Sequence, residues 1–303
     1  MPVIARRMLP ALAAAAVLPP APARAGPEGP PFALPRSASW EMRSGQDRSR
    51  RHSIFLAWPE TPPPPAGYPV LYLLDGKATF PMGVAGARQL NAAEAAPALL
   101  VGLDYPDDAP RRPDPRARDL TPMAPGAPPG TGQAEPFLDF IEHQLSAEIA
   151  RRFPVDPARQ SIFGHSYGGL CGLYGFFTRP HLFHRTIAAS PSIWWQDGVV
   201  LEAERRFAAA MPPGTERRGL LITAGSEEQP VEEQLAELSP RRRERLRHAA
   251  MVTRAQDLAR RMAALGPRGP ETAFRLFEGE THGSALMPAL ALGLRFALRP
   301  DPA

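Results

Sequence analysis

A serine between two glycines is the strongest chemical signal in this chain. Gly164-His165-Ser166-Tyr167-Gly168 follows the short apolar run 161–163. This is the G-x-S-x-G pattern of a nucleophile elbow, where a strand turns sharply into a helix and the serine hydroxyl projects above a sheet. Apolar residues follow it at helical spacing: Leu170, Leu173, Tyr174 and Phe177. We therefore expect Ser166 to be the nucleophile of an acyl-transfer reaction.

A serine hydroxyl needs a base to remove its proton. The chain has seven histidines: His52, His143, His165, His181, His184, His248 and His282. In hydrolases built on this elbow the chain order is serine, acid, histidine, which leaves the four histidines after the elbow. Of these, His282 lies in the loop 279–284, between a strand pattern and an apolar helical pattern. Because such loops gather catalytic groups, we expect His282 to be the base.

The third member of a catalytic triad is a carboxylate that orients the histidine. The apolar run 220–223 predicts a strand, and Glu227 and Glu228 follow it almost at once. Two adjacent carboxylates cannot both face His282, and we expect Glu228 to do so. The alternatives are Glu227, Asp197 after the preceding strand, and a serine and histidine that work without an acid.

The oxyanion of an acyl-transfer intermediate needs two backbone donors. One is the N–H group after the nucleophile, here that of Tyr167, and the other comes from the loop after an early central strand. Residues 68–74 have the pattern of that strand, so Gly76 or Lys77 is expected to supply the second donor. Lys77 is also the only lysine in the chain, which suggests a site for a point charge; a solvated surface lysine is the alternative.

Strand-like runs alternate with helical patterns along most of the chain. The strand-like runs lie near 52–58, 68–74, 98–103, 159–164, 185–189, 219–224 and 272–278. This alternation predicts an α/β fold with a mostly parallel sheet and helices on both faces. The length suits one domain, expected over 39–300. The Pro-rich stretch 106–129 is long for an internal loop, so we expect it to form part of a pocket wall.

The first 25 residues have the pattern of a signal peptide. Arg6-Arg7 precedes an apolar stretch over 8–18, and Ala23-Arg24-Ala25 resembles a cleavage site. The apolar stretch is too short to span a membrane, and no cysteine near the cleavage site could carry lipid. We expect export by the Sec or twin-arginine route to the periplasm of a Gram-negative bacterium, with a Pro-rich segment over 26–38 ahead of the domain.

Charge and cysteine content exclude several classes of protein. Loss of Arg6, Arg7 and Arg24 with the leader lowers the formal net charge from +4 to +1, which is unlike the basic footprint of nucleic-acid binding. The arginine-rich run 241–245 is expected to be the solvated face of a helix. The single cysteine, Cys171, excludes an intrachain disulfide. No histidine or cysteine cluster has metal-ligand spacing, so we expect no metal and no cofactor.

Several segments together resemble one known family. They are YPVLYLLDG over 68–76, RDLTP over 118–122, GHSYGG over 164–169, ASPSIWW over 189–195 and EGETHGSAL over 278–286. The sequence is similar to the esterase D-like group of α/β-hydrolases, and within it to bacterial esterases that open the trilactone ring of catecholate siderophores such as enterobactin, salmochelin and bacillibactin. The similarity runs from about residue 40 to 297.

The resemblance implies an α/β-hydrolase fold and a carboxylic ester hydrolase with Ser166 as nucleophile and His282 as base. The acid position varies within this group, so the resemblance does not specify Glu228. The implied substrate is the trilactone backbone of a catecholate siderophore, and its cleavage would aid iron release. The alternatives are a general short-chain periplasmic esterase and an acyltransferase of the same fold.

Ferric catecholate siderophores are anionic and carry flat aromatic rings. A pocket for them needs cations and aromatic faces near the nucleophile. We expect Arg118 or Lys77 to supply a cation, and Trp194 and Trp195 to supply aromatic faces, because the tryptophans follow the strand next to the elbow. Packing of one or both tryptophans into the core is the alternative. The substrate brings its iron already coordinated, so no metal ligand is expected in the protein.

Overall fold

The computed structural model describes residues 32–91, 93–109 and 114–300. The chain divides into a short unit, Met1–Ala33, and a large one, Leu34–Ala303, and the large unit is described here by itself. The predicted signal peptide, residues 1–25, and residues 26–31 of the segment after it lie outside the described residues. Within the described residues, no helix combines the length and apolar character that crossing a membrane requires.

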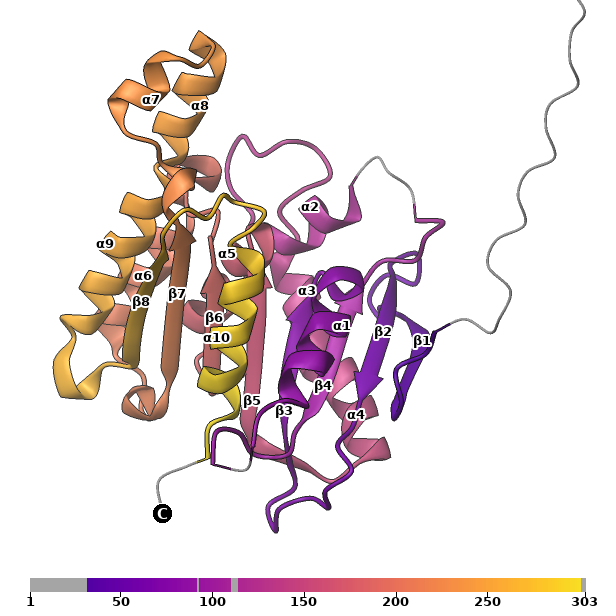
Figure 1. The fold of residues 1–303 in the computed structure, drawn as a ribbon. Coiled ribbons are helices and arrows are strands. Elements are labelled where there is room, and N and C mark those ends of the chain that lie inside the picture. Colours follow the sequence, from indigo (N-terminus) through magenta and orange to yellow (C-terminus); the bar gives the residue numbers. More distant parts are fainter. Residues whose placement is uncertain (1–31, 92, 110–113, 301–303) are drawn as a thin grey trace, which may run out of the picture. The chain divides into compact units, whose positions relative to one another are not determined.

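Eight strands form one sheet in the order β1-β2-β4-β3-β5-β6-β7-β8 (Figure 1). Their bounds are β1 Ser37–Arg43, β2 Arg51–Ala57, β3 Tyr68–Leu74, β4 Leu99–Asp104, β5 Val155–His165, β6 Arg185–Ala189, β7 Gly219–Gly225 and β8 Glu271–Phe277. The pairs β1–β2 and β2–β4 are antiparallel, and every other neighbouring pair is parallel. This mostly parallel sheet with helices confirms the expected α/β-hydrolase fold.

Helices fill the connections between the strands. The α-helices are α1 Gly76–Ala87, α2 Pro115–Leu120, α3 Ala134–Phe140, α4 Ser146–Arg152, α5 Tyr167–Thr178, α6 Val200–Ala210, α7 Glu232–Ala236, α8 Pro240–Ala249, α9 Met251–Ala263 and α10 Leu286–Leu298. A π-helical turn, Ile141–Leu145, joins α3 to α4, so helical backbone runs without a break over residues 134–152. Short 3-10 turns lie at Trp195–Gly198, Thr215–Arg217, Ser226–Glu228 and Gly266–Arg268.

The central strands are buried on both faces, which explains their nearly continuous apolar sequences. On β3, Leu71 and Leu73 pack in the cluster that contains α1 and α10. Val70 and Tyr72 alternate with them and pack against α3 and α4 on the opposite face. The helices α5, α6 and α9 complete that second face toward β7 and β8. This period of two places one hydrophobic layer on each side of the sheet.

The strand β1 was absent from the sequence-based expectations. Its sequence, SASWEMR, has few apolar residues, and most of its side chains are exposed or half-buried. It pairs with β2 along its whole length at the edge of the sheet. An edge strand is stabilised by backbone pairing on one side and needs little apolar surface, so its sequence pattern is weak.

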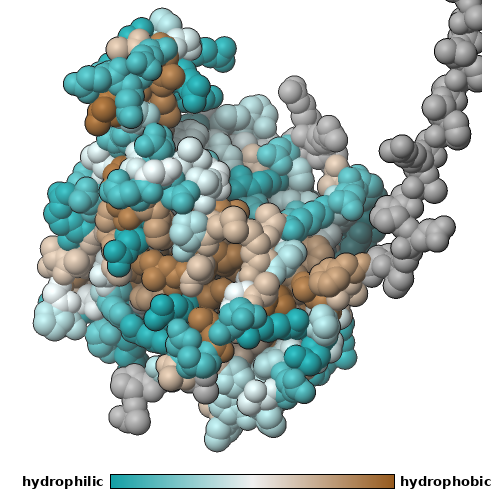
Figure 2. Space-filling model, in the orientation of Figure 1, coloured by the Kyte–Doolittle hydropathy of each residue, from teal (hydrophilic) through white to brown (hydrophobic). Residues whose placement is uncertain are grey.

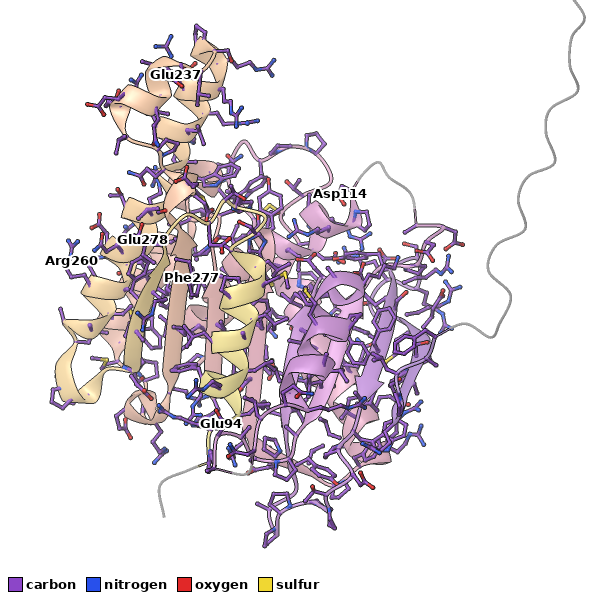
Figure 3. The ribbon with its side chains drawn as sticks, viewed as in Figure 1. Glu94, Asp114, Glu237, Arg260, Phe277 and Glu278 are labelled. Carbon is purple, nitrogen blue, oxygen red and sulfur yellow. The ribbon has the colours of Figure 1, made fainter. Side chains whose placement is uncertain are left out.

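The carboxyl ends of the parallel strands meet at one edge of the sheet, where open α/β sheets bind their ligands. In Figure 3, Asp114 before α2 and Glu278 after β8 lie toward this edge, whereas Glu94 lies at the opposite end of the strands. The ribbon of α7 and α8 extends beyond the same edge (Figure 1). The segments that hold the predicted site residues are the connections that follow β3, β4, β5, β6, β7 and β8.

Candidate active site

Ser166 occupies a strained turn between β5 and α5. Its backbone angles are φ 60° and ψ −117°, an arrangement that costs a non-glycine residue roughly 1–3 kcal/mol. The Ser166 N–H group donates to the carbonyl of Ala189 on the neighbouring strand. A Cβ on Gly164 would lie 2.2 Å from the backbone of Gly168, so the turn can close only with glycine there. These are the features of a nucleophile elbow.

Glu228 and His282 form a close side-chain pair. His282 Nδ1 lies 2.5 Å from Glu228 Oε2, while Glu228 Oε1 accepts from Ser190 Oγ at 2.5 Å and from the Gly225 N–H group at 2.7 Å. Only 4% of Glu228 is exposed. Burial alone would raise the pKa of the Glu228 carboxyl, but the bonds from His282, Ser190 and Gly225 outweigh it and lower the pKa below its usual value. The carboxylate is therefore held ionised and can stabilise a charged imidazole.

A close backbone approach brings the loop after β7 to the histidine loop. The Glu227 N–H group donates to the Glu280 carbonyl at 3.0 Å, and the Gly279 N–H group donates to Ser226 Oγ at 2.9 Å. A Cβ on Gly225 would lie 2.2 Å from the Glu280 carbonyl oxygen. Glycine at 225 is therefore required for the two loops to meet, and their meeting sets the position of Glu228 beside His282.

The structure distinguishes the candidate acids by their surroundings. Glu227 and Asp197 are both exposed, and Asp197 lies in the 3-10 turn after Trp194. Glu228 alone of the three contacts His282 with its side chain among the described residues. Ser190, which also binds Glu228, was not singled out from the sequence, although it lies inside the ASPSIWW segment directly after β6.

Ser166, Glu228 and His282 line one cavity of about 510 Å³. Its other lining residues are Ser192, Trp194, Glu227, Arg242, Arg245, Leu246, His248, Ala249, Met251, Thr281 and Gly283. The Ser166 hydroxyl makes a hydrogen bond of 3.3 Å with that of Ser192. The cavity thus brings the expected nucleophile, base and acid to one space that also contains a tryptophan and two arginines.

The expected oxyanion donors lie on two adjacent turns. Tyr167 begins α5 directly after the nucleophile, and the turn between β3 and α1 lies beside the elbow, because a Cβ on Gly168 would lie 3.4 Å from Asp75 Oδ2. The Lys77 N–H group already donates to Asp104 Oδ2 at 2.8 Å. The Lys77 ammonium pairs with Asp107 at 2.6 Å. Of the two expected second donors, the Lys77 N–H group is therefore already bonded, and the role of the Gly76 N–H group stays a prediction.

Arg116, rather than the expected Arg118, lies at the elbow. Arg118 pairs with the buried Asp119 at 2.6 Å. Arg116 pairs with Asp75 at 2.5 Å, donates to the His165 carbonyl at 3.2 Å and places its guanidinium 5.6 Å from the centre of the Tyr167 ring. Residues two apart on a helix point in nearly opposite directions, so only one of these arginines on α2 could face the site.

The two expected tryptophans have different environments. Trp194 is half-buried and lines the cavity that contains Ser166. Trp195 is 5% exposed, donates from Nε1 to the Pro122 carbonyl at 3.3 Å and packs edge-on against the Tyr167 ring. The structure therefore places Trp195 in the core beneath the site and leaves Trp194 as the tryptophan that can contact a ligand.

His165 is a second histidine beside the base, and sequence reasoning assigned it no role. Its ring centre lies 4.6 Å from that of His282, and its buried Nε2 has no hydrogen-bond partner among the described residues. Burial and the neighbouring His282 lower the pKa of His165 to about 4. A neutral imidazole therefore packs against the proposed base at neutral pH.

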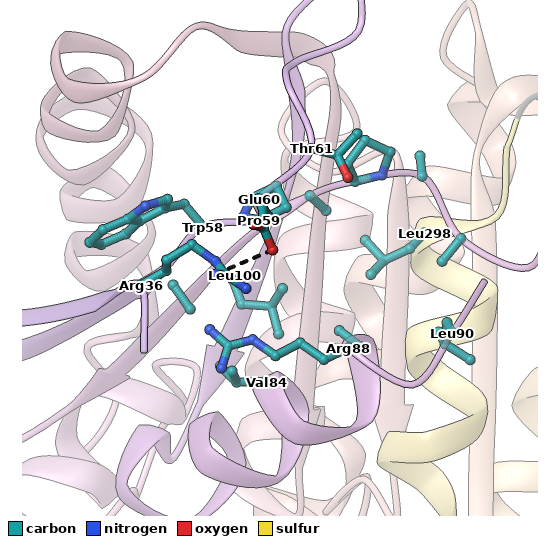
Figure 4. Close-up of a pocket in the computed structure, with 16 residues that line it drawn as sticks. Arg36, Trp58, Pro59, Glu60, Thr61, Val84, Arg88, Leu90, Leu100 and Leu298 are labelled. Atoms are coloured by element: carbon teal, nitrogen blue, oxygen red, sulfur yellow. Dashed lines mark ion pairs between the residues drawn. The ribbon is translucent and has the colours of Figure 1, made fainter. Parts of the chain in front are cut away.

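A second cavity, of about 260 Å³, lies at the other end of the strands (Figure 4). Ala57 at the end of β2, Leu100 near the start of β4 and Leu298 at the end of α10 line it, and Arg36 pairs with Glu60 across it at 3.5 Å. None of the predicted site residues lines this cavity. Over the described ranges, no group of three or more His, Cys, Asp or Glu side chains could hold a metal ion.

Comparisons with known proteins identify the family. The Esterase family model matches residues 46–268. Ferri-bacillibactin esterase BesA of Bacillus subtilis is 35% identical over 274 residues, which cover 86% of this chain and 89% of the relative. Siderophore triacetylfusarinine C esterase of Aspergillus fumigatus is 34% identical, with 87% of this chain and 94% of the relative covered.

Solved structures give the same result. The BES protein of Bacillus cereus has a TM-score of 0.74 and 29% identity, with 91% of this chain and 99% of that chain covered. Siderophore hydrolase EstB of Aspergillus nidulans has a TM-score of 0.77 and 25% identity, with the same coverage. This chain belongs to the Esterase family and is a carboxylic ester hydrolase with the α/β-hydrolase fold, similar to the siderophore esterases.

Proposed function

We propose that this chain hydrolyses the ester bonds of a siderophore, with a trilactone backbone as the preferred substrate, through Ser166, His282 and Glu228. The observation that carries the proposal is the Glu228–His282 pair, which lines the same cavity as the serine of the elbow. The relatives named as esterases of bacillibactin and triacetylfusarinine C support the choice of siderophore.

The contacts support a defined role for each group. Glu228 Oε2 accepts the Nδ1 proton of His282, which leaves Nε2 as the basic nitrogen. His282 Nε2 then takes the proton of Ser166 as its oxygen attacks the ester carbonyl, and later gives it to the departing alkoxide. Departure of this alkoxide breaks one ester bond and opens the ring. His282 Nε2 then removes a proton from water as the water attacks the acyl-enzyme, and gives it to the Ser166 oxygen when that oxygen leaves.

The developing oxyanion needs donors that are already in place. In this proposal the N–H groups of Tyr167 and Gly76 bind it. Each follows the carboxyl end of a strand after one intervening residue, so each belongs to a tight turn. One such donor contributes roughly 100- to 1,000-fold to kcat in serine hydrolases. The Lys77 N–H group, bonded to Asp104, is not assigned this role.

The direct test is hydrolysis of a trilactone by the purified mature chain. Ferric and iron-free bacillibactin or enterobactin should be opened with a higher kcat/KM than p-nitrophenyl acetate, as followed by chromatography of the linear products. Ser166→Ala and His282→Ala should each remove this activity and leave the circular dichroism spectrum unchanged. Activity restricted to p-nitrophenyl esters would indicate a general short-chain esterase. Transfer of the acyl group to an added alcohol instead of water would indicate an acyltransferase.

The proposal includes export to the periplasm. It is supported by the order of charged, apolar and small residues over 1–25. The protein recovered from a periplasmic extract should begin at about Gly26 by N-terminal sequencing. A cytoplasmic product that retains Met1 would contradict export.

A further inference from the structure

The helix α8 forms part of the cavity that contains Ser166, although its sequence predicted only a solvated face. Arg242, Arg245, Leu246 and Ala249 line that cavity at helical spacings of three and four residues. Such residues share one face of a helix. The arginine-rich run is therefore a solvated helical face, as predicted, and also a wall of the cavity that contains Ser166.

Packing into the core does not explain the composition of α8. None of its ten residues is buried. In Figure 2, the segment formed by α7 and α8 is covered mainly by hydrophilic residues on the visible face. A helix without a buried face gains little from the hydrophobic effect. Its side chains are not needed for core packing and can contact a ligand.

Ion pairing separates the arginines of α8 into two groups. Arg247 forms an ion pair with Glu232 of α7 and so links the two helices. Over the described ranges, no carboxylate oxygen lies within 4.0 Å of the Arg242 or Arg245 guanidinium nitrogens. These two guanidinium groups thus remain available to an anion at the cavity. Glu227 is the acidic residue that also lines this cavity without binding His282.

Aromatic and apolar surface lies next to these cations. Trp194 lines the same cavity, and its ring centre lies 6.3 Å from that of His248 on α8, in an edge-on arrangement. Leu246 lies between Arg245 and Arg247 in sequence and also lines the cavity. Flat rings bind such surfaces, while guanidinium groups bind anionic oxygens in bidentate geometry.

We propose that the cavity face of α8 is an anion-binding subsite, in which Arg242 and Arg245 bind the negatively charged, non-reacting part of an ester substrate. The proposal rests on the proposed function for the identity of the ester site. It makes α8 a determinant of specificity: esters whose remote part carries deprotonated carboxylate or catecholate oxygens are preferred over neutral esters of the same length.

The probes are two p-nitrophenyl esters of similar length, mono-p-nitrophenyl glutarate, which carries a carboxylate, and p-nitrophenyl valerate, which is neutral. The variant is Arg242→Gln/Arg245→Gln, and the control is Arg241→Gln/Arg243→Gln, which removes the same charge from residues that do not line this cavity. The ratio of kcat/KM for the anionic ester to that for the neutral ester should fall roughly fivefold or more in the first variant, mainly through KM. The control variant should keep most of the wild-type ratio of kcat/KM for the two esters.

Ionic strength provides a second readout. Exposed charges are screened within about 10 Å at 0.1 M salt, so the preference of the wild type for the anionic ester should decrease as salt is added. The Arg242→Gln/Arg245→Gln variant should show a weaker salt dependence. Equal effects of the two double variants, or an unchanged ratio in the first, would overturn the subsite.

The test separates the subsite from the proposed substrate. A wild type that opens no trilactone, but whose charge preference depends on Arg242 and Arg245, would contradict the siderophore proposal and leave the subsite standing. Efficient trilactone opening that is insensitive to Arg242→Gln/Arg245→Gln would support the siderophore proposal and contradict the subsite.

Discussion

At the scale of single residues, Glu228 is the group whose role the contacts define most closely. Its two carboxyl oxygens take three hydrogen bonds, one of them from His282 at 2.5 Å. In Glu228→Gln the amide presents one oxygen and one NH2 group, so it cannot accept at both positions. We expect kcat for ester hydrolysis to fall by roughly 100- to 10,000-fold. The amide favours the His282 tautomer that carries its proton on Nε2, and that nitrogen can then no longer act as the base.

Glu227→Gln is the matched control for this prediction. It changes the neighbouring residue in the same way, but Glu227 is exposed and its backbone N–H group, which the substitution retains, makes the contact with Glu280. Its loss of kcat should be much smaller than that of Glu228→Gln. Steady-state kinetics with p-nitrophenyl acetate would measure both. Small and equal effects would show that Ser166 and His282 act as a dyad.

At the scale of elements, one arginine joins the C-terminal end of α5 to α3 and the π-helical turn. Arg179 is 8% exposed and pairs with Glu135 and Asp139 at 2.6 Å and with Glu142 at 2.8 Å. Removing this buried guanidinium leaves the three carboxylates to repel each other with much less compensating charge. Arg179→Met should therefore lower the free energy of unfolding by about 2 kcal/mol or more, as measured by urea denaturation.

An exposed helical ion pair serves as the comparison. Arg205 pairs with Glu202 three residues before it on α6, and both side chains are well exposed. Such pairs contribute about 0.3–0.5 kcal/mol, so Arg205→Met should shift the urea midpoint little. If both substitutions destabilise the protein equally, the Arg179 cluster has no special structural role.

At the scale of the whole molecule, buried histidines should make stability depend on acid pH. His52 is 2% exposed and stacks on Phe140 with ring centres 4.4 Å apart. Burial lowers the pKa of His52 from 6.5 to about 4, and burial also lowers that of His165 to about 4. Between these values the unfolded chain binds protons that the folded chain does not, so the free energy of unfolding falls as pH is lowered from about 6.5 to about 4.

The variant His52→Phe tests this dependence. One such histidine contributes a slope of at most about 1.4 kcal/mol per pH unit within the window. The variant should lose that part of the slope, because phenylalanine cannot bind a proton. His143→Gln, at an exposed position, should keep the wild-type slope. Urea denaturation at pH 4.5, 5.5 and 6.5 gives the comparison; parallel curves for His52→Phe and the wild type would contradict the prediction.

Much of this protein could be predicted from local sequence patterns. A buried parallel strand has a continuous apolar run, and a nucleophile elbow needs glycine at 164 because a Cβ there would meet the backbone of Gly168. Both requirements act within a few residues, so the sequence by itself determined the central strands, the α/β class and the place of Ser166 at the turn after β5. The catalytic roles of Ser166, His282 and Glu228 remain predictions.

Only the tertiary structure decided which side chains meet. The sequence indicated Arg118 or Lys77 as a cation and Trp194 and Trp195 as aromatic faces, without showing which of these side chains meets the site. The packing of α2 and of the turn after β6 placed Arg116 beside Asp75 and buried Trp195 under Tyr167. It likewise brought the arginines of α8 to the cavity of Ser166. Such contacts join segments far apart in the chain, and no local pattern encodes them, because the direction of a side chain depends on how whole elements pack.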